Sequence, residues 1–159
     1  MPVVIDGHNL LHAIQKSHEE FESITAVGLC QIINKYLKSN NERGEIVFDG
    51  TGPRDKTGFE GMSNLEVIFA GIGTDADTVI ENKIKANTAP KRLTVVSSDR
   101  RVRSAAKARR AIMLKSPLFW EKIRKWSMRK RAFKEPQAKK NGLTESETKK
   151  WLEFFGLIQ

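Results

Sequence analysis

"LTVVSSDRRVRSAAKARR", residues 93–110, joins a short β-branched apolar run to an alanine-rich segment. The first part predicts a strand over residues 92–98, and the second predicts a helix over residues 100–109. Asp99 stands between them, and six basic residues follow it within the segment. An ion pair needs only one basic partner for one carboxylate, so the remaining positive charge indicates contact with a polyanion.

The rest of the chain alternates in the same way between apolar runs and helical patterns. We expect further strands over residues 3–5, 45–50, 65–70 and 111–115, and further helices over residues 22–38 and 76–86. This alternation predicts right-handed β-α-β units and a parallel sheet with helices on both faces. The predicted fold class is therefore α/β.

Two regions are expected along the chain, an α/β domain over residues 1–116 and a basic helical extension over residues 117–159. Pro117 stands at a favoured first-turn position and opens one helical pattern. Thr144 and Glu147 form a capping box before a last apolar helical pattern. That last helix could cover its own sheet or a neighbouring subunit, so the oligomeric state stays open.

Charge is distributed unevenly along the chain. Residues 1–90 carry 8 Lys/Arg and 13 Asp/Glu, whereas residues 91–134 carry 16 Lys/Arg and only two acids. A basic band of this size usually meets nucleic acid or an anionic membrane, although a merely solvated face is the plain alternative. Because the band begins at a candidate active-site acid, we favour nucleic acid.

Several classes of protein are disfavoured. No apolar run approaches the ~20 residues of a membrane span, and the start MPVVIDGHNL lacks the features of a signal peptide. Cys30 is the single cysteine, which rules out an intrachain disulfide and favours a reduced, cytoplasmic protein. Residues 50–57, GTGPRDKT, resemble a phosphate-binding loop, but Asp55 takes a glycine position, so no nucleotide cofactor is expected.

Acidic residues follow the predicted strands. Asp6 follows the first strand, Asp49 ends the second and Asp99 follows the fourth, while Asp75 and Asp77 follow the third across a short turn. Ligands of an open parallel sheet bind beyond the carboxyl ends of its strands. Convergent carboxylates raise one another's pKa unless a cation neutralises them. Oxygen ligands without clustered His or Cys indicate Mg²⁺ or Mn²⁺.

Some of these acids have simpler interpretations. Asp49 precedes a glycine and could only form a turn. Asp75 could only cap the helix that Asp77 opens. Glu81 lies one turn after Asp77, so it could join the acidic cluster or pair with Lys85.

Four segments carry a family resemblance: VVIDGHNLLHA (3–13), IVFDG (46–50), LEVIFAGIGTDADTVIENKI (65–84) and LTVVSSDRRVRSAAKARRA (93–111). In this order they resemble the PIN-like nucleases, specifically the NYN domain family and its YacP-like bacterial branch. The resemblance covers residues 2–115. It implies a three-layer fold with strand order 3-2-1-4-5, which would set Asp6 opposite Asp99, and metal-dependent cleavage of RNA.

The resemblance also implies roles for individual residues, carried over by matching position. Asp6, Asp77 and Asp99 would form the metal-binding core, Asn9 would assist near the scissile phosphate, and Asp49 and Glu81 would be secondary ligands. Whether one or two ions bind stays open. An endonuclease mode follows from the resemblance alone.

RNA contacts are expected along the basic band and beside the acids, because guanidinium and backbone N–H groups at a helix start both bind phosphate. A surface position, or contact with substrate, is expected for His8, whose spacing to His12 resembles a zinc pair without a third ligand. The predicted RNA-binding residues are His8, Ser98, Arg100, Arg101, Arg103, Lys107, Arg109, Arg110, Lys122 and Arg124. Trp120 and Trp126 could stack on bases, but their helical spacing favours core packing.

The sequence therefore predicts a ribonuclease that depends on Mg²⁺ or Mn²⁺ and has RNA as its partner. A non-catalytic RNA- or ribosome-binding module on the same fold is the alternative. A pure binder would have no reason to keep Asp6, Asp77 and Asp99 together. A phosphoacceptor domain is disfavoured, because the expected acidic pair near the first strand is missing.

Overall fold

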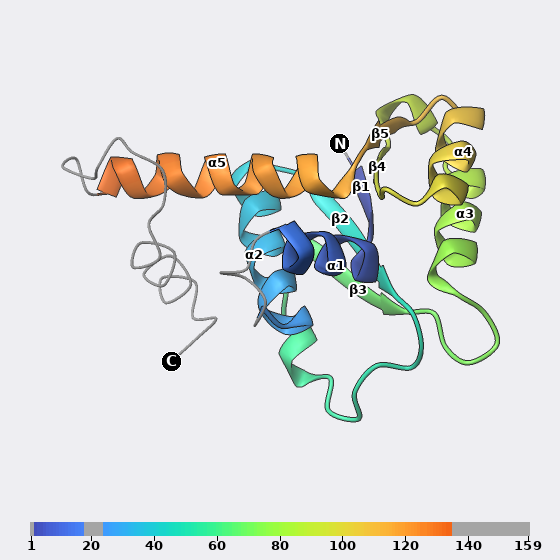
Figure 1. Cartoon of the computed structure of the whole chain (residues 1–159), viewed down its shortest axis with the longest axis horizontal. Coiled ribbons are helices and arrows are strands. Elements are labelled where there is room, and N and C mark those ends of the chain that lie inside the picture. The colour runs from blue at the N-terminus through green and yellow to red at the C-terminus, as the bar shows by residue number, and fades with distance from the viewer. Residues whose placement is uncertain (1, 18–23, 135–159) are drawn as a thin grey trace.

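The structure, a computed structural model, describes residues 2–17 and 24–134. At its centre lies a five-stranded parallel sheet (Figure 1). The strands are β1 (Pro2–Asp6), β2 (Arg43–Phe48), β3 (Leu65–Phe69), β4 (Thr94–Val96) and β5 (Ile112–Leu114). Their order is β3-β2-β1-β4-β5, which confirms the predicted topology.

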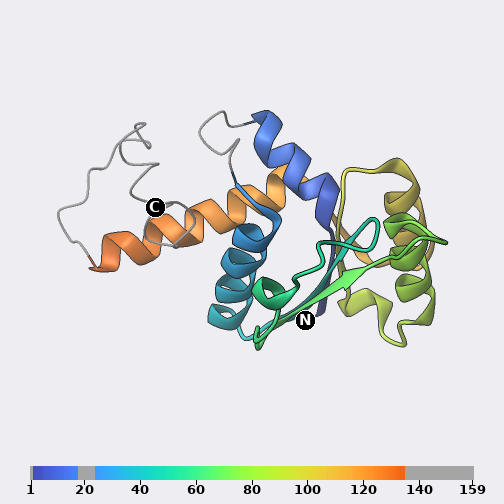
Figure 2. The same cartoon turned by 90° about the horizontal axis from the view of Figure 1, so that it is seen from below.

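Helices cover both faces of the sheet (Figures 1 and 2). One layer contains α1 (Gly7–Ser17), α2 (Ala26–Ser39) and α5 (Ser116–Lys134), and the other contains α3 (Ala76–Ala86) and α4 (Arg100–Ala108). Two single-turn 3₁₀ helices, η2 (Thr57–Phe59) and η3 (Pro90–Arg92), lie in connecting segments. The α/β class and its three layers are confirmed.

Helix α1 is the element that the sequence did not predict. It follows β1 with no intervening loop, and it buries Leu10 and Ile14 one turn apart. A Cβ at Gly7 would lie only 2.5 Å from ring atoms of Phe48. Glycine therefore lets the chain turn from strand to helix against that ring, which holds Asn9 close to Asp6.

The strand side chains alternate between two cores. Ile5 and Phe48 belong to the core beneath α1, α2 and α5, whereas Val4 and Val47 belong to the core beneath α3 and α4. This alternation is the period of two that a strand imposes. Because both faces are covered, the buried parts of the central strands, Val3–Ile5 of β1 and Ile46–Phe48 of β2, are continuous apolar runs.

The first half of α5 completes the core beside α1 and α2. Phe119, Trp120 and Ile123 are buried, and Trp126 donates from Nε1 to Ser39 Oγ at 3.0 Å. Both tryptophans therefore take part in packing, which is the interpretation that their spacing favoured.

The predicted division of the chain between residues 116 and 117 stays a prediction. The second predicted helix of the extension, with its capping box at Thr144 and Glu147, lies outside the described residues. Within residues 2–17 and 24–134, no helix has the length and apolar character needed to cross a bilayer.

Candidate active site

The acids predicted at strand ends lie at the carboxyl end of the sheet. Asp6 is the last residue of β1, Asp49 directly follows β2, and Asp99 caps α4 shortly after β4. Because β1 pairs with both β2 and β4, Asp6 takes the central place. Chain direction switches at this point of the sheet, where open α/β folds bind their ligands.

Asp6 is a buried carboxylate with few partners. The residue is only 5% exposed, Oδ2 accepts a hydrogen bond from Ser97 Oγ at 3.0 Å, and Oδ1 accepts one from Asn9 N at 3.5 Å. Burial raises the pKa of Asp6 above its usual value, and the negative charges of Asp49 and Asp99 raise it further. The two hydrogen bonds lower that pKa in part.

Ser97 is a site residue that sequence reasoning missed. Its hydroxyl donates to Asp6 and accepts from the backbone N of Asp99 at 3.0 Å. One buried oxygen thus connects two of the predicted metal-binding acids. The only sequence feature that could have indicated Ser97 is the pair of serines before Asp99. Ser98, a predicted RNA contact, is the exposed member of that pair.

Asp99 is the N-cap of α4. Its Oδ1 accepts hydrogen bonds from Arg101 N at 2.9 Å and Val102 N at 3.3 Å. A capping carboxylate also complements the positive end of the helix dipole. Its other oxygen, Oδ2, accepts no hydrogen bond from the described residues. One carboxylate oxygen of Asp99 therefore stays available to a ligand.

The pKa of Asp77, in the first turn of α3, is raised by the charges of both other acids. Its pKa rises from 3.8 to about 6, first because of burial and then because of the negative charges of Asp99, Asp6 and Asp75. Arg101 offsets part of that rise. Asp6, Asp77 and Asp99 therefore share one region of negative potential, although they come from three elements.

These side chains do not form a complete metal-binding geometry among the described residues. In the described ranges, no three His, Cys, Asp or Glu side chains converge closely enough to hold an ion. The donor chemistry nevertheless fits a hard divalent cation, because all the donors are carboxylate oxygens and the pKa values of Asp6 and Asp77 are raised. No described Lys, Arg or His forms an ion pair with Asp6, Asp77 or Asp99, so their charge is left for another cation to balance.

Asp49 and His8 form one edge of the site. Asp49 Oδ1 accepts a hydrogen bond from Ala76 N at 2.8 Å, and the Asp49 backbone N donates to His8 Nδ1 at 3.2 Å. The His8 ring also meets Phe48 edge-on at 5.2 Å between centroids. Asp49 therefore holds the start of α3 against the end of β2, which is more than a turn residue does.

Asn9 connects α1 to the opposite edge of the site. Its Oδ1 accepts hydrogen bonds from Ser98 N at 2.9 Å and from Ser116 Oγ at 2.6 Å. Ser116, fully buried at the start of α5, also donates from its backbone N to Ser98 Oγ at 3.2 Å. The Nδ2 group of Asn9 donates to none of the described residues.

Two of the acids have local partners on α3 and α4. Asp75 is the N-cap of α3 and accepts a hydrogen bond from Thr78 N at 2.7 Å, as its simpler interpretation predicted. Glu81 forms an ion pair with Arg101 and not with Lys85. Arg101 also contacts Asp75, so this arginine, which we had expected to bind RNA, is occupied by α3.

The other predicted RNA-binding residues divide between two faces of the molecule. Arg100, Lys107, Arg109 and Arg110 are exposed on or just after α4, and Arg109 donates to the backbone oxygen of Asn87 at 2.8 Å. Half-buried Arg103 has no hydrogen-bond partner for Nε among the described residues. Lys122 is exposed on α5, and Arg124 lies 3.7 Å from Glu121. Figure 1 shows α4 and α5 on opposite sides of the sheet, so the basic residues form two groups.

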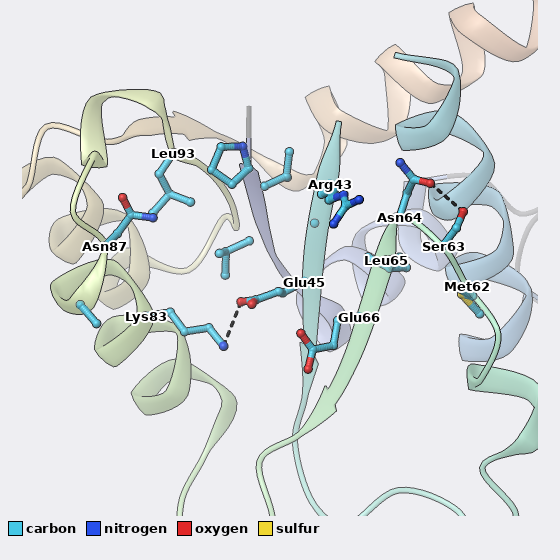
Figure 3. Close-up of a pocket in the computed structure, with 15 residues that line it drawn as sticks. Arg43, Glu45, Met62, Ser63, Asn64, Leu65, Glu66, Lys83, Asn87 and Leu93 are labelled. Atoms are coloured by element: carbon cyan, nitrogen blue, oxygen red, sulfur yellow. Dashed lines mark hydrogen bonds and ion pairs between the residues drawn. The ribbon is translucent and has the colours of Figure 1, made fainter. Parts of the chain in front are cut away.

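A groove with a volume of about 480 Å³ lies at the other end of the sheet (Figure 3). Its lining includes Pro2, Arg43 and Leu65, which are the first residues of β1, β2 and β3. It also includes an ion pair between Lys83 and Glu45 at 2.9 Å. None of Asp6, Asp77 or Asp99 lines it. The acidic site and this groove are therefore separate features.

Comparison with known proteins gives a family and a fold. The model of the YacP-like NYN domain matches residues 3–155. The crystal structure of Rae1 (YacP) from Bacillus subtilis is similar at a TM-score of 0.64 and 20% identity, over 98% of this chain and 92% of that one. The W164L mutant of that protein gives a TM-score of 0.65 at 20% identity, over 96% and 91%. No curated protein matches. The chain therefore belongs to the YacP-like NYN domain family, which is a family of nuclease type.

Proposed function

We propose that this protein is an endoribonuclease that depends on Mg²⁺ or Mn²⁺ and acts in the cytoplasm. The observation that carries the proposal is the placement of Asp6 at the end of β1, Asp77 in the first turn of α3 and Asp99 at the N-cap of α4, where the charges of Asp6 and Asp99 raise the pKa of Asp77. Folding brings these carboxylates together against their mutual repulsion, which a divalent cation would relieve. The NYN family membership supports a nuclease and an RNA substrate.

Asp6, Asp77 and Asp99 would hold the cation, which supplies Lewis acidity toward water and a phosphoryl oxygen. Ser97 fixes the direction of the Asp6 carboxylate and favours its ionised form. Asn9 keeps its carbonyl oxygen on Ser98 and Ser116, so its Nδ2 can donate to a phosphate oxygen. The exposed arginines and lysines of α4 would hold the RNA backbone beside the acids.

The direct test is cleavage of a structured and an unstructured RNA with Mg²⁺ or Mn²⁺, with a chelator as the negative control. Asp6→Asn and Asp99→Asn should each lower the rate by more than about 100-fold, beyond the usual effect of losing an outer partner of a metal ligand. Asp55→Asn is the matched control, because that exposed acid bonds only to Thr57 among the described residues. Normal cleavage by either site variant would refute the assignment.

A non-catalytic RNA- or ribosome-binding module is the second candidate. The separation of the acidic side chains favours it, because no described group of three is ready to hold an ion. A binder would retain RNA or co-sediment with ribosomes in chelator and cleave nothing when Mg²⁺ or Mn²⁺ is added. The same experiment thus distinguishes the two candidates.

A further inference from the structure

We propose that Arg101 is a positioning residue that holds Asp77 on α3 in register with Asp99 on α4. The inference rests on the proposed nuclease function, and it goes beyond that function by assigning Arg101 and Glu81 to the geometry of the site. Arg101 is not primarily an RNA ligand in this arrangement, and Glu81 is not primarily a metal ligand.

The guanidinium of Arg101 contacts the N-cap of α3 and two residues of the helix itself. Its Nη1 lies 3.3 Å from Asp75 Oδ2, its Nη2 donates to Thr78 Oγ1 at 2.9 Å, and its Nε pairs with Glu81 Oε1. Positions spaced by three residues lie along one face of a helix. Each guanidinium nitrogen therefore has its own partner on or beside α3, and these contacts use three of the five N–H donors of Arg101.

The main chain of the same arginine holds the other acid. Arg101 N donates to Asp99 Oδ1 at 2.9 Å. Asp77 lies between Asp75 and Thr78, the two residues that the side chain of Arg101 holds at the start of α3. One residue thus connects the turn that carries Asp77 to the carboxylate of Asp99.

A second contact fixes the start of α3 from the opposite side. Asp49 Oδ1 accepts from Ala76 N at 2.8 Å and joins this turn to the end of β2. Asp49 and Arg101 therefore hold Asp77 between β2 and α4. With either contact removed, α3 could shift relative to the sheet while its buried residues Ile80 and Ile84 stayed in the core.

Exposure indicates that the ion pair between Arg101 and Asp75 serves geometry more than stability. The side chains of Arg101 and Asp75 are 49% and 53% exposed, and pairs of this kind stabilise a fold only slightly. Small displacements of a catalytic group, in contrast, reduce rates strongly. The loss of Arg101 should therefore affect the chemical step far more than folding.

The test compares Arg101→Ala and Arg101→Lys with Lys85→Ala. Lys85 is an exposed lysine on α3, it carries the same charge, and it is the partner of Glu81 that the sequence allowed. The measurements are the single-turnover cleavage rate, the RNA dissociation constant in chelator, and hydrogen exchange at the Thr78 and Val79 amides.

Arg101→Ala should lower the cleavage rate by about 10- to 100-fold, as the loss of an outer partner of a metal ligand does. RNA affinity should stay unchanged, and exchange at both amides should become faster. Arg101→Lys should recover part of the rate, and Lys85→Ala should resemble the wild type. Adding Glu81→Gln to Arg101→Ala should lower the cleavage rate little further, because both changes remove the same contact between Arg101 and Glu81.

Two results would overturn the assignment. If Arg101→Ala weakens RNA binding as much as it lowers the rate, Arg101 contacts phosphate. If exchange at Thr78 and Val79 is unchanged, α3 is held without Arg101. Failure of the proposed function is recognised separately, since the wild type would then cleave no RNA while the exchange measurement would still report whether Arg101 holds α3.

Discussion

Ser97 Oγ lies 3.0 Å from Oδ2 of Asp6 and donates a hydrogen bond to it inside the protein. The residues belong to neighbouring parts of the sheet, because β1 and β4 are paired. The same hydroxyl accepts from the backbone of Asp99. A small side chain outside the acidic set therefore orients the carboxylate of its central member and partly offsets the effect of burial on its pKa.

Ser97→Ala should raise the pKa of Asp6 further, because the hydrogen bond from Ser97 is the leading influence that lowers it. The acidic limb of the pH–rate profile should move to higher pH. The free energy of unfolding should fall by about 1–3 kcal/mol, since buried polar groups lose their partner. Ser104→Ala, at an exposed position of α4, should change neither quantity. An unshifted acidic limb would contradict this role of Ser97.

Asp77→Asn should stabilise the protein when no divalent ion is present. The folded-state pKa of Asp77 is raised from 3.8 to about 6, so its ionised form is disfavoured in the fold. Stability is thus highest below the unfolded pKa and is lost as the pH rises through the folded value. At neutral pH the variant should gain on the order of 1 kcal/mol, after a discount for solvent screening of this partly exposed group.

Denaturation in chelator at several pH values measures the effect of Asp77→Asn. The two proteins should converge below the usual carboxyl pKa of 3.8, where Asp77 is neutral in both states. A variant that is less stable than the wild type at neutral pH would contradict the proposed repulsion.

Gly7→Ala should destabilise the fold by about 1–3 kcal/mol, which is typical of an overpacked core. The new Cβ would meet the Phe48 ring at 2.5 Å. Gly73→Ala is the control, because a Cβ there meets no atom within 4 Å. Urea denaturation of both variants gives the comparison, and equal midpoints would show that the turn after β1 adapts easily.

Arg100→Gln should reduce the salt dependence of RNA binding. Each lost phosphate contact lowers the slope of log affinity against log salt by about 1, or somewhat less for a single strand. Lys91→Gln removes the same charge in η3, before β4 begins and so away from the acids. Equal slopes for both variants would indicate that RNA does not lie at the carboxyl end of the sheet.

Local patterns predicted most of the fold. The β-branched runs before Asp6, Asp49 and Asp99 became strands, and the spacing over residues 76–86 became α3 with the predicted bounds. Helix α1 was missed because it begins directly at Gly7, with no turn between it and β1.

Side-chain partners were harder to predict, because they depend on how distant elements meet. Ser97 has no chemical pattern of its own in the sequence, and its role arises only when β4 pairs with β1. Arg101 follows an acid in a basic run, which is typical of a phosphate ligand. Its partners on α3 become evident only once α3 and α4 lie side by side.

The placement of Ser116 has a consequence for proteolysis. This residue bonds to Asn9 at the acidic site, and three residues just after it, Phe119, Trp120 and Ile123, are buried with Ile5 of the central strand. A cut in the peptide between β5 and α5 would therefore expose those aromatic and aliphatic groups to water and break the hydrogen bond between Ser116 and Asn9. Resistance of the peptide between β5 and α5 to proteolysis should accordingly correlate with the rate of RNA cleavage.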